Sequence, residues 1–78
     1  MQNVKEIVLN CYSVLPCFVM VCDGGILWGI SELSEYEARE DGVALYREQH
    51  GDCSQADAED ALDGASVYRL VDGEYEYC

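Results

Sequence analysis

The sequence predicts an α+β fold, in which two helices pack on one face of an antiparallel sheet of about five strands. Three observations predict it: apolar runs around paired glycines, two helix-start motifs in the middle of the chain, and a hairpin motif near its end. The expected order of elements is β-β-β-α-α-β-β. The 78 residues contain no linker or repeat, so residues 1–78 are expected to form a single domain.

Three strands are expected in the first part of the chain. Val4–Tyr12 is rich in valine, isoleucine and leucine, which are typical of strands. Cys17–Asp23 and Ile26–Ser31 flank Gly24-Gly25, and paired glycines between apolar runs favour a tight hairpin. These runs are apolar on both faces, so the strands are expected to be central and covered.

A first helix is expected to begin at Ser34. Ser34 and Glu37 fit a capping box, in which the side chain of each accepts a hydrogen bond from the backbone N–H of the other. Leu33 and Ala38 occupy the two positions of a hydrophobic staple. Gly42 lies inside this helix and indicates either close packing on the sheet or a break.

Gly51 is expected to end the first helix, because glycine readily takes the left-handed conformation of a helix cap. A second, shorter helix is expected to begin at Ser54, with Asp57 in the capping-box position, and to end at Gly64. Its apolar stripe consists mainly of alanines, which implies a close approach to the element that it covers.

A hairpin is expected at the end of the chain. Ser66–Val71 and Glu74–Cys78 are separated by Asp72-Gly73, one of the strongest sequence signals for a two-residue turn. This turn fixes the register of the two strands. The expected pairs are Val71 with Glu74, Leu70 with Tyr75, Arg69 with Glu76, and Tyr68 with Tyr77.

The chain has a net charge of −12, and the charge is unevenly distributed. Residues 1–30 contain two acids against Lys5, whereas residues 31–78 contain fourteen acids against three arginines. Such a surface repels nucleic acid and anionic lipid, and it attracts basic protein surfaces. Direct binding to nucleic acid or a membrane is therefore not expected. The expected partner is a basic surface of a nucleic-acid-binding protein or complex.

No catalytic or metal-binding motif is present, so neither enzyme activity nor a cofactor is expected. His50-Gly51-Asp52-Cys53 places an imidazole near a thiol, but catalytic cysteine and histidine usually come from distant parts of a chain. Nearby acids would also raise the pKa of this thiol, which disfavours a nucleophile. Cys11, Cys17 and Cys22 lack the spacing of a zinc site, and the residues around Gly64 do not fit a calcium-binding loop.

The five cysteines indicate a reduced, cytoplasmic protein, because their number is odd and their spacing suggests no disulfide framework. Asn10, Ser13 and Pro16 interrupt the first apolar run. This interruption argues against a signal peptide and against a membrane span, which needs roughly 20 apolar residues in succession.

The acidic face of the two helices is the candidate interaction surface. The second helix carries four acids and no basic residue, so carboxylates at helical spacing repel one another. Between Asp57 and Asp63 the four carboxylates span about 9 Å, a density comparable to the one phosphate per about 1.7 Å of duplex DNA. Two tyrosines on the first helix are candidate anchors. The expected partner-binding residues are Asp57, Glu59, Asp60, Asp63, Glu35, Glu37, Glu40, Asp41, Tyr36 and Tyr46.

In its size, its charge and its lack of catalytic motifs, the chain resembles the small acidic inhibitors of phages and mobile elements, such as anti-CRISPR and anti-restriction DNA mimics. The resemblance implies that carboxylates replace phosphates against arginine and lysine of a CRISPR effector or restriction nuclease in the host cytoplasm. Two alternatives stay open. One is a protein-interaction domain that binds through its sheet or an apolar patch, and the other is a halophile-type domain whose acids hold hydration.

Overall fold

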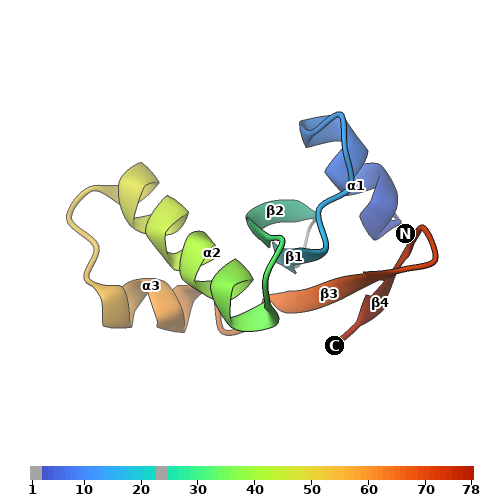
Figure 1. Ribbon diagram of the computed structural model, residues 1–78. Coiled ribbons are helices and arrows are strands. Elements are labelled where there is room, and N and C mark those ends of the chain that lie inside the picture. The colour runs from blue at the N-terminus through green and yellow to red at the C-terminus, as the bar shows by residue number, and fades with distance from the viewer. Residues whose placement is uncertain (1–2, 23–24) are drawn as a thin grey trace.

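A computed structural model describes residues 3–22 and 25–78, and Figure 1 shows how their helices and strands are arranged. The elements are α1 (Val4–Cys11), β1 (Phe18–Cys22), β2 (Ile26–Ser31), α2 (Glu35–His50), α3 (Gln55–Ala61), β3 (Ser66–Val71) and β4 (Glu74–Tyr77). The strands of this described part form one four-stranded antiparallel sheet in the order β2-β1-β3-β4. The α+β class is confirmed, with one strand fewer and one helix more than predicted.

Helices lie on both sides of the sheet, with α1 against one face and α2 against the other (Figure 1). The predicted second helix, α3, packs mainly against α2 and not on the sheet. The side chains of the central strand β1 alternate between two apolar clusters. Met20 packs with Leu62 on the side of α2 and α3. Val19 and Val21 pack with Val8 of α1 on the opposite side. This burial on two sides explains why the run that forms β1 is apolar on both faces.

The segment predicted as a first strand, Val4–Tyr12, forms helix α1 instead, so that prediction was wrong. The Asn3 side chain caps the helix by accepting a hydrogen bond from the backbone N–H of Lys5 at 2.8 Å. Ile7 and Val8 are buried, whereas the two residues that follow them are exposed. The β-branched residues favour a strand, but their spacing also fits one face of a helix, and the uncovered face of the sheet selects the helix.

The antiparallel pairing of β1 with β2 is confirmed. Asp23, the last residue of the predicted strand, and Gly24 of the predicted Gly24-Gly25 turn lie outside the described residues. Gly25 has a φ of 79°, and its N–H donates to the carbonyl oxygen of Cys22 at 3.1 Å. The register shifts once along this pair and leaves Trp28 without a partner on β1.

Two glycines allow α2 to lie close to β2. A Cβ atom on Gly29 would collide with the carbonyl oxygen of Ala38 and would lie 2.7 Å from the nitrogen of Gly42. A Cβ atom on Gly42 would meet the end of the Met20 side chain. Because α2 runs without interruption from Glu35 to His50, Gly42 marks close packing on the sheet and not a break.

Helix α2 begins and ends as predicted, although its capping differs in detail. Ser34 Oγ accepts a hydrogen bond from the N–H of Glu37 at 3.1 Å. The N–H of Ser34 donates to Ser31 Oγ at 3.4 Å, in place of the predicted Glu37 carboxylate. Leu33 is 77% exposed, so the predicted hydrophobic staple is not formed. Gly51, with a φ of 66°, ends the helix.

The hairpin of β3 and β4 has the predicted turn and register. Asp72 and Gly73 have φ values of 50° and 83°, and a type I′ turn requires positive φ at both positions. The hydroxyl of Tyr75 donates to the carbonyl oxygen of Pro16 at 2.6 Å, which ties the hairpin to the segment before β1. The observed pairs are Tyr68 with Tyr77, Arg69 with Glu76, Leu70 with Tyr75, and Val71 with Glu74.

Candidate functional site

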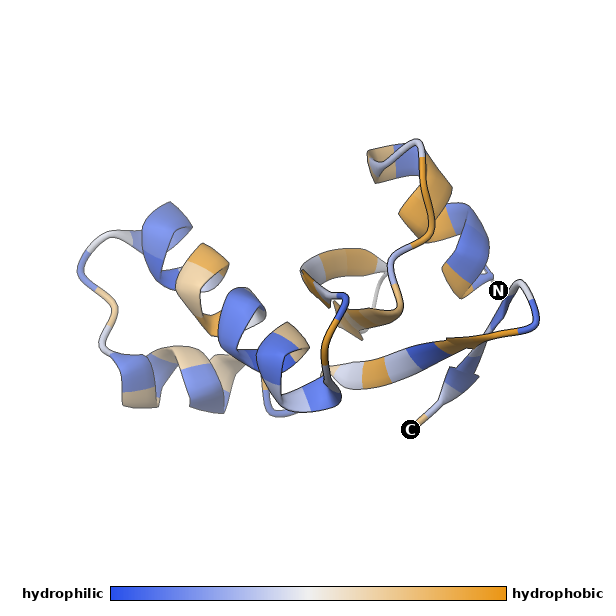
Figure 2. Cartoon of the chain, viewed as in Figure 1, coloured by the Kyte–Doolittle hydropathy of each residue, from blue (hydrophilic) through white to orange (hydrophobic). Residues whose placement is uncertain are grey.

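Nine of the ten predicted partner-binding residues lie on two helices that pack against each other. The tenth, Asp63, does not, because α3 ends at Ala61 and not at the predicted Gly64. All eight carboxylates of the ten residues are exposed, and Figure 2 shows hydrophilic residues along both helices. Ser54 Oγ caps α3 by accepting a hydrogen bond from the N–H of Asp57 at 3.2 Å, as predicted. Glu35, Tyr36, Glu37, Glu40, Asp41 and Tyr46 lie on α2, Asp57, Glu59 and Asp60 lie on α3, and Asp63 lies in the turn after α3. These eight carboxylates are named the acidic surface below.

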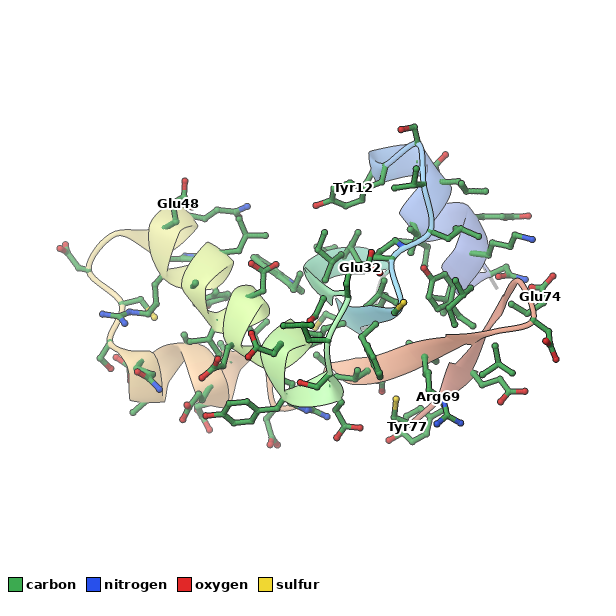
Figure 3. All side chains as sticks on the ribbon, viewed as in Figure 1. Tyr12, Glu32, Glu48, Arg69, Glu74 and Tyr77 are labelled. Atoms are coloured by element: carbon green, nitrogen blue, oxygen red, sulfur yellow. The ribbon has the colours of Figure 1, made fainter. Side chains whose placement is uncertain are left out.

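The acidic surface has no close basic partner. Within residues 3–22 and 25–78, one ion pair is shorter than 4 Å: Lys5 Nζ lies 3.5 Å from Glu74 Oε1. Figure 3 shows Glu74 at the end of the molecule opposite Glu48, which points outward from the end of α2. Arg47 of α2 instead donates through its Nε to the carbonyl oxygen of Cys53 at 3.2 Å. The negative charge of this surface is therefore not offset by a close ion pair within the described residues.

Asp41 differs from the other acids because it has a role within the fold. Its Oδ2 accepts a hydrogen bond from the backbone N–H of Ile30 at 3.1 Å. Ile30 lies in β2, at an edge of the sheet, where this N–H has no strand to bind. Asp41 thus joins α2 to the sheet edge.

The two candidate tyrosines have different surroundings. Tyr36 is 68% exposed, and interaction with Glu40, first as a hydrogen-bond acceptor and then as a negative charge, raises the pKa of its hydroxyl. The charge of Glu59 adds to this rise, so Tyr36 lies near acids of both helices. Tyr46 is half-buried, and its ring stacks on His50 with the ring centroids 4.1 Å apart. Tyr36 is therefore free to contact a partner, whereas Tyr46 is part of an aromatic cluster.

A groove of about 420 Å³ lies between α2 and α3. Apolar side chains form its inner part, and charged side chains of both signs form its rim. We call it the α2–α3 groove. Its lining residues are Met20, Tyr36, Arg39, Glu40, Val43, Ala44, Arg47, Gln55, Glu59, Leu62 and Asp63.

The α2–α3 groove combines residues that the sequence predicted for partner binding with residues that it did not. Tyr36, Glu40, Glu59 and Asp63 belong to the predicted set, whereas the arginines and the apolar lining do not. One signal was present: the lining residues of α2 recur three and four positions apart, as one ridge of a helix does. This spacing defines a face of α2, but only the position of α3 turns that face into a groove.

The side chains of His50 and Cys53 interact with different groups and not with each other. His50 stacks on Tyr46, and Cys53 Sγ donates to the carbonyl oxygen of Ser54 at 3.4 Å. All five cysteines are free thiols. Elsewhere in the chain, interaction with Glu32, mainly as a hydrogen-bond acceptor, raises the pKa of Cys17. A raised pKa keeps this thiol protonated and makes it a weaker nucleophile.

The described ranges, 3–22 and 25–78, contain no group of three histidine, cysteine or acidic side chains arranged to hold a metal ion. In the same ranges, no helix has the length and apolar character needed to cross a membrane.

Comparison with known proteins gave no match to a family model, to a curated protein or to a solved structure.

Proposed function

We propose that the protein is a stoichiometric inhibitor that occupies the basic nucleic-acid-binding groove of a host CRISPR effector or restriction-type nuclease. The observation that supports this proposal is the acidic surface, whose eight carboxylates are exposed and have no ion pair shorter than 4 Å. These carboxylates would take the place of nucleic-acid phosphates against arginine and lysine of the target. Inhibition by occupancy involves no reaction and no cofactor.

The helices that carry the acidic surface are held in place by the rest of the fold, which suits an inhibitor that acts by occupancy. Ser34 and Ser54 fix the starts of α2 and α3 by hydrogen bonds, Ala38 buries α2 against the sheet, and the buried Ala58 belongs to α3, which packs against α2. Carboxylates on supported helices keep their spacing before a partner arrives. Binding then requires little ordering of the inhibitor, which favours affinity.

The α2–α3 groove favours a second candidate function, a protein-interaction domain that does not imitate nucleic acid. A mimic of phosphates needs no apolar groove, whereas an apolar pocket that accepts a partner side chain is common at protein interfaces. In this case the acidic surface would mainly accelerate association. High salt would then lower the association rate and leave most of the lifetime of the complex unchanged.

A competition experiment with purified nucleases tests the proposed function. A fluorescent duplex is bound to a guide-loaded Cas9 complex or a type I restriction nuclease, and the protein is titrated in at several salt concentrations. We expect displacement of the duplex from at least one nuclease, with affinity that falls steeply as salt rises. A variant with Asp57→Asn, Glu59→Gln, Asp60→Asn and Asp63→Asn should compete about tenfold less well, or worse, because four charge contacts are lost.

A matched variant separates the acidic surface from net charge. Glu6→Gln, Asp72→Asn, Glu74→Gln and Glu76→Gln remove the same number of charges from α1 and the β3–β4 hairpin. This control should compete as well as the unaltered protein, and circular dichroism should show both variants folded. Equal loss in the two variants, or no loss in the first, would contradict the proposal.

A further inference from the structure

The inner part of the α2–α3 groove is apolar and consists largely of core side chains. It consists mainly of Met20 from β1, Val43 from α2 and Leu62, which follows α3. Met20 and Leu62 belong to the buried core and are 1% and 4% exposed. The volume of about 420 Å³ lies within the range of sites that hold small ligands or long side chains. The groove therefore offers an apolar contact that does not have to be formed on binding.

The rim of the groove carries three carboxylates. Glu40 of α2 and Glu59 of α3 both raise the pKa of the Tyr36 hydroxyl, so these three groups lie near one another although they come from two helices. Asp63 lines the same groove. An aromatic ring beside carboxylates is a favourable environment for a cation that has a flat, polarisable head.

Two arginines of the chain also line the groove, and Arg39 lies between Tyr36 and Val43 along α2. Arg39 and Arg47 are eight residues apart, or about 12 Å along the helix axis, and Val43 lies midway between them. Arg47 is held at the α2–α3 loop by its hydrogen bond to the Cys53 carbonyl oxygen. Arg39 is near Cys78 at the end of the hairpin, where its charge acts on that thiol. Within the described residues, neither arginine forms an ion pair shorter than 4 Å with a carboxylate of the rim.

We infer that the α2–α3 groove receives the side chain of an arginine from the partner protein. The inference rests on the proposed function, since it names the contact that anchors a basic partner on the acidic surface. The aliphatic part of arginine lies against Val43 and Leu62 while its guanidinium reaches the carboxylates of the rim. A guanidinium can pair with a carboxylate through two parallel hydrogen bonds and stack on Tyr36, whereas a lysine ammonium is a point charge. An apolar side chain would leave the carboxylates of the rim, which have only neutral hydrogen-bond partners such as Gln55 on Glu59, without a cation.

A peptide titration followed by nuclear magnetic resonance tests this inference directly. The probe is a capped tripeptide with arginine between two glycines. We expect saturable shifts of the Val43 and Leu62 methyl signals and of the Tyr36 ring. The same peptide with citrulline, which keeps the shape of arginine and removes its charge, should bind about tenfold more weakly or worse because its hydrogen bonds to carboxylates are no longer charge-assisted. Equal binding of both peptides would overturn the inference.

Matched variants locate the binding. Ala44 lines the groove and is exposed, so Ala44→Phe should fill the groove without unfolding the protein and should weaken peptide binding about tenfold. Ala56 is exposed on α3 and does not line the groove, so Ala56→Phe should leave binding unchanged. Glu59→Gln, which keeps the size of the side chain, should weaken binding, whereas Glu48→Gln, at an exposed acid of α2 outside the groove and the acidic surface, should not. Undiminished binding to Ala44→Phe would overturn the inference.

The same variants distinguish failure of the inference from failure of the proposed function. If Ala44→Phe displaces the duplex from a nuclease as well as the unaltered protein does, while the four-amide variant does not, the groove inference is wrong and nucleic-acid mimicry stands. If the arginine peptide binds in the groove but no nuclease loses its duplex, the groove is a site for basic side chains and mimicry is wrong.

Discussion

Gly29 sets the distance between α2 and the sheet. A Cβ atom at this position would collide with the backbone of α2 at Ala38, and backbone cannot move aside as the end of a side chain can. We expect Gly29→Ala to lower the free energy of unfolding by about 3 kcal/mol, at the upper end of overpacking effects. Urea unfolding followed by circular dichroism measures this change.

Gly42 is the matched control for Gly29. A Cβ atom on Gly42 would meet only the flexible end of Met20, and alanine is favoured over glycine by about 1 kcal/mol inside a helix. The two effects oppose each other, so Gly42→Ala should change the free energy of unfolding by less than about 1 kcal/mol. If both variants lost the same stability, the close backbone contact at Gly29 would not be the cause.

Tyr75 makes stability depend on alkaline pH. Burial raises its pKa to about 12, and the charges of Cys17 and Glu32 add to the rise. An unfolded tyrosine titrates near pH 10, so the folded state favours the neutral phenol. This stabilisation is complete below about pH 10 and is lost as pH rises through about 12. We expect the free energy of unfolding to fall over this interval in urea titrations.

Two phenylalanine variants isolate the contribution of Tyr75. Tyr75→Phe removes the hydrogen bond to Pro16, so its free energy of unfolding at neutral pH should be about 1 kcal/mol lower. The decrease of its free energy of unfolding above pH 10 should be smaller than in the unaltered protein. Tyr12 is 42% exposed, and Tyr12→Phe should keep the full alkaline fall. An unchanged fall in Tyr75→Phe would show that other groups cause it.

Among the elements, the two edge strands of the described sheet are protected differently. At the edge formed by β2, the Asp41 carboxylate of α2 accepts a hydrogen bond from the backbone N–H of Ile30. The edge formed by β4 is open and carries Glu74 and Glu76, and charged residues on an edge oppose pairing with another copy. The edge acids thus keep the sheet from extending between molecules.

Replacing the edge acids should cause self-association. With Glu74→Val and Glu76→Val, β4 becomes an alternation of valine and tyrosine, which favours pairing of edges. We expect a sedimentation coefficient that rises with protein concentration. Glu74→Gln with Glu76→Gln loses the same charge without the β-branched side chains and should stay closer to the monomer. Monomeric behaviour of the valine variant would show that charge does not protect this edge.

Elements were predictable where local chemistry determines them. The Asp72-Gly73 turn fixes the register of its hairpin, and Ser34 and Ser54 mark helix starts, because each acts within a few residues. The segment Val4–Cys11 was not predictable in this way, since valine and isoleucine favour a strand while their spacing also fits a helix. The sheet face that α1 covers settles its conformation.

The candidate site was likewise predictable from the sequence only where local chemistry determines it. The positions of the acids on two helices followed from helix-start motifs and charge alone. The α2–α3 groove did not, because it depends on how α3 lies against α2 and on the hydrogen bond from Arg47 to the loop between them. Asp41 looked like the other acids in the sequence, but its position next to the N–H of Ile30 gives it a role in the fold.

The charge of the whole molecule makes its stability depend on salt. A net charge of −12 with one close ion pair in the described part implies repulsion that salt screens. The Debye length falls from about 30 Å at 0.01 M salt to about 10 Å at 0.1 M, so the melting temperature should rise over this interval and then level off. Circular dichroism melts measure it, and the four-amide variant of α3 should show a smaller rise.

The halophile-type alternative predicts a different salt curve. A domain whose acids serve hydration in high salt would be unfolded at low salt and would keep gaining stability into the molar range. A protein folded at 0.01 M sodium chloride, with a melting temperature that levels off, would exclude this alternative. A steady rise to molar salt would support it against the inhibitor proposal.

The strand order has a consequence for the order of folding. β1 pairs with β2, which follows it at once, but also with β3, and the contact between Phe18 and Arg69 closes a loop of about fifty residues. Closing such a loop costs entropy that only the completed sheet offsets. Helix α2 packs mainly on β2, which precedes it, whereas Leu62 after α3 packs with Val67 of β3, so strands from both sides of this segment in the sequence hold the acidic surface in place. A peptide cut out as residues 34–63 would therefore not keep its helices together, and the surface cannot be reduced to a shorter inhibitor.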